Sequence, residues 1–517
     1  MYSISEKWWF DSHARGIISL CIMLATISAA QGQVVQGNRY EIILGEGEQP
    51  FQVAPAQQDG IFLYRGFDGA EKNALQLIAL DTAFQERWSG FITLEKTMTE
   101  SRVCYANNSL YVLLRYRDFS KHDMQILDID KEKGTYFIHS FRNFIPMQIT
   151  SFQVTREGAL IGGYFNRIPV VLFYSFRERR SKLLPGLFSE TGELTQIRTY
   201  PDDTFDVLVS ALNMLRQQTI IIRNYDAEGN IIKNMSLKPD EKKNLIFGQS
   251  IKTFEDMQMV AGVYGNRNSE FSKGIFMASI DPAGNDLLKY YSYGDLENFF
   301  KYMRARREQR VKDRIARRRV KGRKIRFNYR FIVHEIVPYK DQYIVLGEAF
   351  YPKYIYTDRG YGGFFGPGYG FSRNAMMQNG RVFDGYYYTH AVVIGFDQNG
   401  KLLWDNSFEI NDVRTFELEQ FVKLDVRPDH ITLLYLFDHQ IRSKIINDNE
   451  VVEGKSIDPI RLRLETDQVK KGGTEKSRLD YWYDHTFYAY GVQTVNNLAA
   501  GVPLKRRVFF INKITHP

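Results

Sequence analysis

Cysteine is scarce in this chain of 517 residues, which holds only Cys21 and Cys104. Cys21 falls in an N-terminal segment that we expect to be removed, so the mature chain would keep one thiol. One thiol cannot form an internal disulfide, so the fold must be stabilised by its core. Proline is also sparse, with 15 residues, and no long low-complexity tract is present, which argues against wholesale disorder.

The familiar catalytic motifs are missing as well. The sequence contains no HExxH, no Walker phosphate loop, no GxSxG and no CxxC. We therefore assign no catalytic residue and expect no metal and no cofactor. His334-Glu335, in an apolar strand, could reach a central channel. Three Asp-His dipeptides invite a metal or acid–base interpretation, but aspartate is common in turns, and we interpret them as turn residues: Asp429-His430, Asp438-His439 and Asp484-His485.

The N-terminus has the parts of a secretory signal peptide. Arg15 precedes the apolar run Gly16–Ala30, which ends in small residues. The run holds about 14 apolar residues, fewer than the roughly 20 that span a bilayer. We predict a signal peptide over residues 1–32, with cleavage after Ala30 or Gly32. The mature protein would then be exported, to the periplasm or in association with the outer membrane.

The rest of the chain is rich in aromatic residues, at 14%, which favours β-structure. A short polar turn followed by a strongly apolar strand recurs along it, as in Gln58-Asp59-Gly60 before IFLYRGF. Most copies are about 50 residues apart, the length of a four-stranded blade, and two longer intervals each hold an insertion of about 35 residues. The turns lie at 58–60, 107–109, 156–158, 202–204, 254–256, 340–342, 428–430 and 484–486.

A second hairpin recurs within these units. An apolar strand ends in aspartate, and two or three turn residues and a glycine usually precede the next strand, as in Asp397-Gln-Asn-Gly400. We count eight units, of which the last, ending at residues 507–514, lacks an outer strand. The unpaired strand at 39–46 would supply it and close the ring. The prediction is an all-β propeller with four-stranded blades, eight in number with seven as the alternative, forming a single domain over residues 33–517. A pair of β-sandwiches fits the regular spacing less well.

Two insertions interrupt this pattern, at about 296–328 and about 352–388. The first links the fifth blade to the sixth, and the second joins the second and third strands of the sixth blade. In a four-stranded blade both connections lie on the same face of the disc. Long loops on a rigid scaffold are where binding functions concentrate, so we expect a binding face at this position.

The first insertion is strongly basic. Residues 301–326 contain 14 lysine or arginine residues and only two acidic residues, a net charge of +12. The whole chain carries +8, so the remainder sums to −4. The segment predicts an exposed helix up to Gly322, either as a solvated arm or as a contact for an anionic surface such as lipid headgroups or lipopolysaccharide, or for an acidic envelope protein. The export signal argues against nucleic acid. Candidate binding residues are Arg304, Arg306, Arg307, Arg310, Arg314, Arg317, Arg318, Arg319, Lys321 and Arg323.

The second insertion is rich in glycine and aromatic residues. Aromatic faces can stack on sugar rings or cover an apolar surface of a partner, so a glycan is a possible ligand. The alternative is a loop that folds over the face of the propeller. Candidate binding residues are Tyr361, Phe364, Phe365, Tyr369, Phe371, Tyr386, Tyr387 and Tyr388.

One hairpin resembles a known family. Asp397-Gln-Asn-Gly400-Lys-Leu-Leu-Trp404 resembles the tryptophan-docking hairpin of quinoprotein dehydrogenases and of related eight-bladed outer-membrane assembly propellers, and Asp81…Trp88 is a looser copy without the glycine. The resemblance implies propeller geometry. Those families repeat the motif in most blades, whereas the other blades of this chain carry lysine, leucine or nothing comparable. The quinoprotein enzymes also hold their cofactor with vicinal cysteines, which one mature cysteine cannot supply, so we do not extend the resemblance to their redox chemistry.

These features together lead to one functional expectation. We expect an exported, non-catalytic binding or scaffold protein of the cell envelope that uses the face bearing both insertions. The alternative is a carbohydrate-binding or carbohydrate-active propeller, which as a hydrolase would need carboxylates converging on the central channel.

Overall fold

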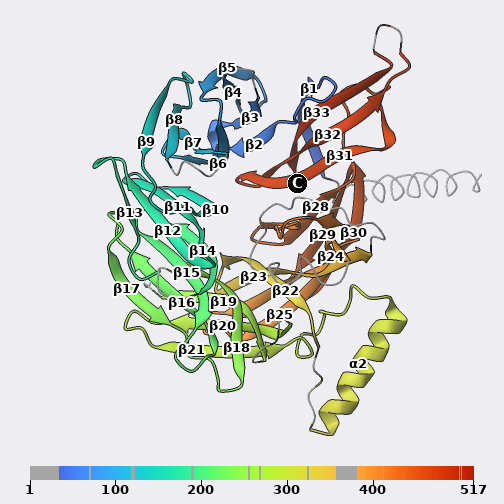
Figure 1. Cartoon of the computed structure of the whole chain (residues 1–517). Helices are drawn as coiled ribbons and strands as arrows, with labels where there is room; N and C mark the ends of the chain where they lie inside the picture. Colours follow the sequence, from blue (N-terminus) through green and yellow to red (C-terminus); the bar gives the residue numbers. More distant parts are fainter. Residues whose placement is uncertain are drawn as a thin grey trace, which may run out of the picture.

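The computed structural model describes residues 34–516, except 69–71, 118–122, 188–190, 254–256, 267–268, 270, 323–324, 326, 357–380, 412, 500 and 502. Eight antiparallel sheets form one ring (Figure 1). The predicted propeller is confirmed, with eight blades and not seven. The predicted signal peptide lies outside the described residues.

Each blade contains four strands that follow one another from the channel outward. Blade 1 is β2 (Gln52–Pro55), β3 (Ile61–Phe67), β4 (Asn73–Leu80) and β5 (Glu86–Leu94). Blade 2 is β6 (Met98–Ala106), β7 (Ser109–Tyr116), β8 (Met124–Asp130) and β9 (Tyr136–Phe141). Blade 3 is β10 (Gln148–Val154), β11 (Gly158–Phe165), β12 (Ile168–Ser175) and β13 (Arg180–Leu183). Blade 4 is β14 (Gly192–Thr199), β15 (Phe205–Leu212), β16 (Gln218–Tyr225) and β17 (Ile231–Ser236).

The remaining blades follow the same plan. Blade 5 is β18 (Lys243–Lys252), β19 (Gln258–Asn266), β20 (Ser272–Ile280) and β21 (Asp286–Ser292). Blade 6 is β22 (Arg330–Tyr339), β23 (Gln342–Tyr356), β24 (Arg381–Asp397) and β25 (Leu402–Glu409), and the short β26 (Arg414–Thr415) also pairs with β24. Blade 7 is β27 (Lys423–Val426), β28 (Ile431–Phe437), β29 (Gln440–Asn447) and β30 (Glu450–Pro459). Blade 8 is β31 (Gln468–Tyr483), β32 (Thr486–Asn496), β33 (Lys505–Thr515) and β1 (Val35–Ile43).

The N-terminal strand closes the ring, as the sequence predicts. β1 pairs antiparallel with β33, and Figure 1 shows the two lying side by side. Arg39 is held in this strand by an ion pair with Glu41 at 2.6 Å and by a hydrogen bond to Asn512 Oδ1 at 2.8 Å. The pairing gives β33 a neighbour on both sides and removes an exposed sheet edge.

The recurring aspartate turns connect the third and fourth strands of their blades. The Asp397 carboxylate accepts hydrogen bonds from the backbone N–H groups of Asn399 at 2.9 Å and Lys401 at 2.7 Å. Gly400 follows with φ of +71°, a conformation that L-residues rarely adopt. Asp81 and Asp226 cap their turns in the same way.

Neighbouring blades dock onto these turns. Trp88 of blade 1 donates its indole N–H to the Lys131 carbonyl of blade 2 at 2.9 Å, and its ring lies over Gly134. Lys233 occupies the equivalent position in blade 4, and its ammonium donates to the Pro282 carbonyl of blade 5 at 2.7 Å. Lys233, at the position that Trp88 occupies in blade 1, therefore makes the same kind of contact between blades.

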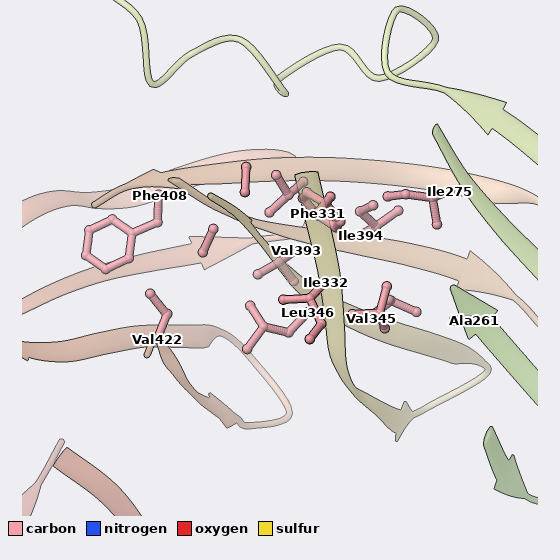
Figure 2. Packing of buried hydrophobic residues seen from close by; sticks show 14 of the residues in the cluster. Ala261, Ile275, Phe331, Ile332, Val345, Leu346, Val393, Ile394, Phe408 and Val422 are labelled. Carbon is pink, nitrogen blue, oxygen red and sulfur yellow. The ribbon is translucent and has the colours of Figure 1, made fainter. Parts of the chain in front are cut away.

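Apolar side chains fill the space between blades. Figure 2 shows the largest cluster, in which residues from blades 5, 6 and 7 meet. Ile275 comes from blade 5, Val345 and Ile394 from blade 6, and Leu433 from blade 7, each at most 1% exposed. Among the described residues no helix is both long and apolar enough to cross a membrane.

Strand alternation defines two faces. The loops between second and third strands, together with the links from one blade to the next, lie on what we call the insertion face. The turns between first and second and between third and fourth strands lie on the opposite face, the turn face. The first insertion links β21 to β22 and contains α2 (Ala305–Val320), so the predicted helix is confirmed. The second joins β23 to β24, as predicted, although these strands extend into it as far as Tyr356 and from Arg381.

Candidate functional site

The helix α2 projects from the ring beyond blade 6 (Figure 1). Glu308, Val311, Lys312 and Ile315 form a narrow, partly buried stripe at helical spacing, and Val311 and Ile315 pack against the large core cluster. The rest of the helix faces solvent. The predicted basic residues that the structure describes are all exposed: Arg304, Arg306, Arg307, Arg310, Arg314, Arg317, Arg318, Arg319 and Lys321. Arg323 lies outside the described residues.

Among the described residues, few cations of α2 have an acidic partner. Lys312 pairs with Glu308 one turn away at 2.7 Å. Arg319 lies 3.9 Å from Asp295 and donates to the Gly294 carbonyl at 3.4 Å, which ties the end of the helix to the base of the arm. The outward arginines thus remain as a dense positive surface on a positioned helix.

The base of the arm is an aromatic cluster on blade 6. Tyr302, just before α2, stacks on His390 with ring centroids 3.7 Å apart and 7° between the planes. Phe299 meets the same imidazole edge-on at 4.8 Å. His390 is fully buried, and burial lowers its pKa to about 3, so the ring is neutral and packs as an aromatic group.

Hydrogen bonds fix the arm's first segment to the outer strand of blade 6. The buried Asp405 carboxylate accepts from the backbone N–H groups of Glu297 at 2.7 Å and Asn298 at 2.8 Å. The Asn298 amide donates back to the Asp405 carbonyl at 2.7 Å. The arm's other end is held at Tyr329, whose carbonyl accepts from Ser272 Oγ at 2.8 Å. Both ends of the insertion are therefore rigidly attached.

Only part of the predicted aromatic site lies in the described structure. Tyr386 and Tyr388 are buried in β24, where Tyr386 meets Phe350 edge-on at 5.6 Å. Tyr387, on the opposite side of the strand, is half-buried and stacks on Tyr351 at 5.6 Å. Tyr386 and Tyr388 therefore serve the core, and only Tyr387 borders the surface. The other predicted aromatic residues lie outside the described residues: Tyr361, Phe364, Phe365, Tyr369 and Phe371.

Two adjoining cavities lie along the inner strands that surround the central channel: one of about 820 Å³ between blades 7 and 8 and the link after blade 6, and one of about 770 Å³ lined by residues of blades 1, 6, 7 and 8. Gln420, Lys423 and Asp480 line both. Lys423 pairs with Asp480 at 2.6 Å, and Gln420 donates its amide to Glu335 at 2.7 Å. The wall is therefore a mixture of anions, cations and amides whose members bind one another.

The turn-face mouth of this channel contains an aspartate–histidine pair. His485 Nδ1 lies 2.6 Å from the buried carboxylate of Asp425, which Arg427 also contacts at 3.0 Å. His485 thus pairs with a residue of blade 7 and not with its neighbour Asp484. Sequence reasoning placed His485 correctly in a first-to-second turn but could not see Asp425, 60 residues away.

The other histidines considered in the sequence analysis contact a neighbouring residue in the chain or a buried residue of the same blade. His430 and His439 each contact the aspartate that precedes them, at 3.0 and 3.2 Å. In the sequence pair His334-Glu335 the two side chains have different partners. His334 Nε2 lies 2.8 Å from the buried Glu348 of the next strand, whereas Glu335 meets Gln420. Among the described residues no group of His, Cys, Asp and Glu has the arrangement of a metal site.

Comparisons with known proteins do not identify a family. No family model matches the chain, and no curated protein sequence matches it. Polysaccharide lyase Uly1 aligns over 80% of this chain and 89% of its own, with a TM-score of 0.40 and 8% identity. A prolyl endopeptidase aligns over 80% of this chain and 50% of its own, with a TM-score of 0.37 and 10% identity. A Synechocystis apocarotenoid oxygenase mutant aligns over 47% of this chain and 62% of its own, with a TM-score of 0.31 and 8% identity. The chain thus spans about half of that prolyl endopeptidase, and scores this low carry no argument about activity.

Proposed function

We propose that this protein is an exported, non-catalytic binding protein of the cell envelope, and that α2 binds an anionic surface. The observation that carries the proposal is the helix itself. It presents nine exposed cationic side chains from Arg304 to Lys321 on an arm whose two ends are fixed to blades 5 and 6.

The chemistry of the helix favours phosphate-bearing surfaces. Arginine keeps its charge at all physiological pH values and binds phosphate with paired N–H donors. Each cation near an anionic membrane surface contributes about 1 kcal/mol of attraction. The apolar stripe of α2 is narrow and already packed, so the attraction would be electrostatic and would weaken with salt.

The channel supports binding over hydrolysis. A glycoside hydrolase directs two carboxyl groups at one substrate bond. In this channel Glu335, Asp480 and Asp425 are each engaged by an amide, an ammonium or an imidazole of the wall. These contacts suit a scaffold whose charged channel is internally compensated.

The test replaces Arg306, Arg310, Arg314 and Arg317 with glutamine, which has a similar helix propensity. Wild type should sediment with vesicles of phosphatidylcholine containing about 30% phosphatidylglycerol, and the variant should lose most of that binding. The matched control carries glutamine at four exposed cations of the turn face, Lys133, Arg177, Lys340 and Lys401, and should bind as wild type. Equal loss in both variants, or no loss in either, would refute the role of α2.

A further inference from the structure

Apolar side chains stand exposed at the tips of loops on the insertion face. Met214 in the β15–β16 loop is 103% exposed, Leu498 in the β32–β33 loop 88%, and Phe144 in the link between blades 2 and 3 76%. Further exposed apolar residues lie on this face, in other loops and links or at the end of a strand or of α2: Leu212, Leu215, Phe271, Val320, Phe416, Leu464 and Leu504.

The turn face shares this property only at strand ends, where Val35, Tyr136, Ile231 and Val451 lie at the start of outer strands and are exposed. None of its described turn residues is an exposed large apolar side chain, and Phe84, which lies in one of these turns, is buried. Most other exposed apolar residues lie on outer strands at the rim, such as Phe91 and Val452, and Tyr481 lies at the end of β31. Both faces close hairpins of the same kind, so hairpin closure does not account for the difference. A single exposed apolar side chain is ordinary, whereas several gathered on one face and bordered by polar groups are typical of protein or membrane interaction sites.

Cations accompany the apolar tips. Exposed Arg142, Arg216, Arg463 and Lys505 lie within two residues of Phe144, Leu215, Leu464 and Leu504. The Arg414 guanidinium lies over the Phe416 ring at 5.1 Å. Carboxylates lie in these loops too: Glu417 and Glu419 after blade 6, Glu465 and Asp467 after blade 7, and Glu270 in the sequence between β19 and β20. Arg414 also pairs with Asp384 at 2.8 Å. Proteins that bind membrane interfaces combine such apolar and cationic residues. The apolar side chain enters the boundary between headgroups and acyl chains, and the neighbouring cation stays at the phosphates.

We propose that the insertion face docks on an anionic lipid bilayer, with these tips in the headgroup region and α2 along the phosphates. The proposal rests on the anionic-surface function of α2 and names its partner. The tips come from six places around the ring, from the link after blade 2 to the last hairpin of blade 8. A bilayer can contact all of them at once, whereas a protein partner of ordinary size covers one contiguous patch.

The first test places a reporter at the most exposed tip. Met214→Trp should be quenched by brominated lipids when the full chain binds vesicles with about 30% phosphatidylglycerol. The control, Val452→Trp on the outer strand β30, should not be quenched beyond the background of the native tryptophans. Quenching at neither position, with binding intact, would overturn the proposal.

The second test removes the apolar contact. Leu212→Ser, Met214→Ser and Leu215→Ser combined should weaken vesicle binding by about tenfold, a loss of about 1.4 kcal/mol shared by three partly inserted side chains. The loss should persist at high salt, where the contribution of α2 is screened. Val451→Ser with Val452→Ser should bind as wild type.

The outcomes separate the two proposals. If the serine variant binds as wild type while the α2 glutamine variant does not, α2 binds an anionic surface but the tips do not enter a bilayer. If the glutamine variant binds as wild type, the function proposed for α2 fails whatever the tips do. A concentration-dependent dimer that the serine substitutions abolish would show that a second copy covers these tips, and would also overturn the lipid proposal.

Discussion

Tyr302 and His390 form a stacked pair at the base of the helical arm, with 3.7 Å between their ring centroids. The pair joins the segment before α2 to the third strand of blade 6. Because His390 is fully buried and neutral, the contact is aromatic packing and not an ion pair.

Tyr302→Ala should therefore loosen the arm without unfolding the ring. Loss of the stack removes about 1 kcal/mol, so amide hydrogen exchange in α2 should accelerate by roughly fivefold while that of the blade cores stays unchanged. Tyr302→Phe keeps the stack and loses only the hydroxyl contact with Tyr329 at 3.0 Å, so exchange in α2 should be slower than in Tyr302→Ala. Faster exchange throughout the propeller in Tyr302→Ala would show that the residue stabilises the whole fold instead.

Trp88 should stabilise the junction of blades 1 and 2. Trp88→Ala removes the packing on Gly134 and the bond to the Lys131 carbonyl, and should cost about 3 kcal/mol of unfolding free energy in denaturant titrations. Trp88→Phe retains a ring but loses the N–H donor, and should cost about 1 kcal/mol. Equal stabilities for Trp88→Phe and Trp88→Ala would mean that the hydrogen bond, and not the ring, holds the junction.

Arg39 should be important for ring closure. Its ion pair with Glu41 is almost fully buried, so Arg39→Ala leaves a buried carboxylate unpaired and should cost about 3 kcal/mol. The double variant Arg39→Met with Glu41→Leu removes both charges and should recover most of that loss. A double variant less stable than Arg39→Ala would contradict this explanation. Thermal unfolding of the three proteins measures the effect.

Glu193 on β14 should make the protein less stable as pH rises. Burial raises its pKa from 4.5 to about 7, because the charged form loses hydration. The folded state therefore binds the proton more tightly than the unfolded chain. This contribution is fully present below pH 4.5 and is lost as pH rises through about 7.

Glu193→Gln cannot ionise, so its stability relative to wild type should increase across that interval. Urea titrations at pH values below and above it measure the difference. A variant whose relative stability stays constant with pH would contradict the raised pKa.

The blade plan was predictable because its signals are local. Aspartate and glycine close the third-to-fourth turns of blades 2, 4, 5 and 6, and the eighth unit lacked one strand in the sequence. The burial of Tyr386 and Tyr388 was not predictable from composition. β24 continues through the aromatic-rich segment, and strand alternation turns both residues inward while Tyr387 faces outward.

The channel pairs and the apolar tips were missed for a different reason. Asp425 and His485 meet only because blades 7 and 8 are neighbours in the ring. Leu212, Met214 and Leu215 are exposed because they lie at and beyond the end of β15, whereas the apolar residues earlier in that strand are buried in the core. Both features depend on how the strands are placed in the tertiary structure, which the periodicity of the sequence does not reveal.

The central claim is that α2 binds an anionic surface through its arginines. The most direct measurement is the vesicle affinity of the full chain as the fraction of anionic lipid rises and then as salt rises. We predict affinity that climbs steeply with anionic lipid, falls with salt, and loses most of both dependences in the variant with glutamine at Arg306, Arg310, Arg314 and Arg317. Equal affinity for neutral and anionic vesicles, or identical curves for wild type and variant, would contradict the claim.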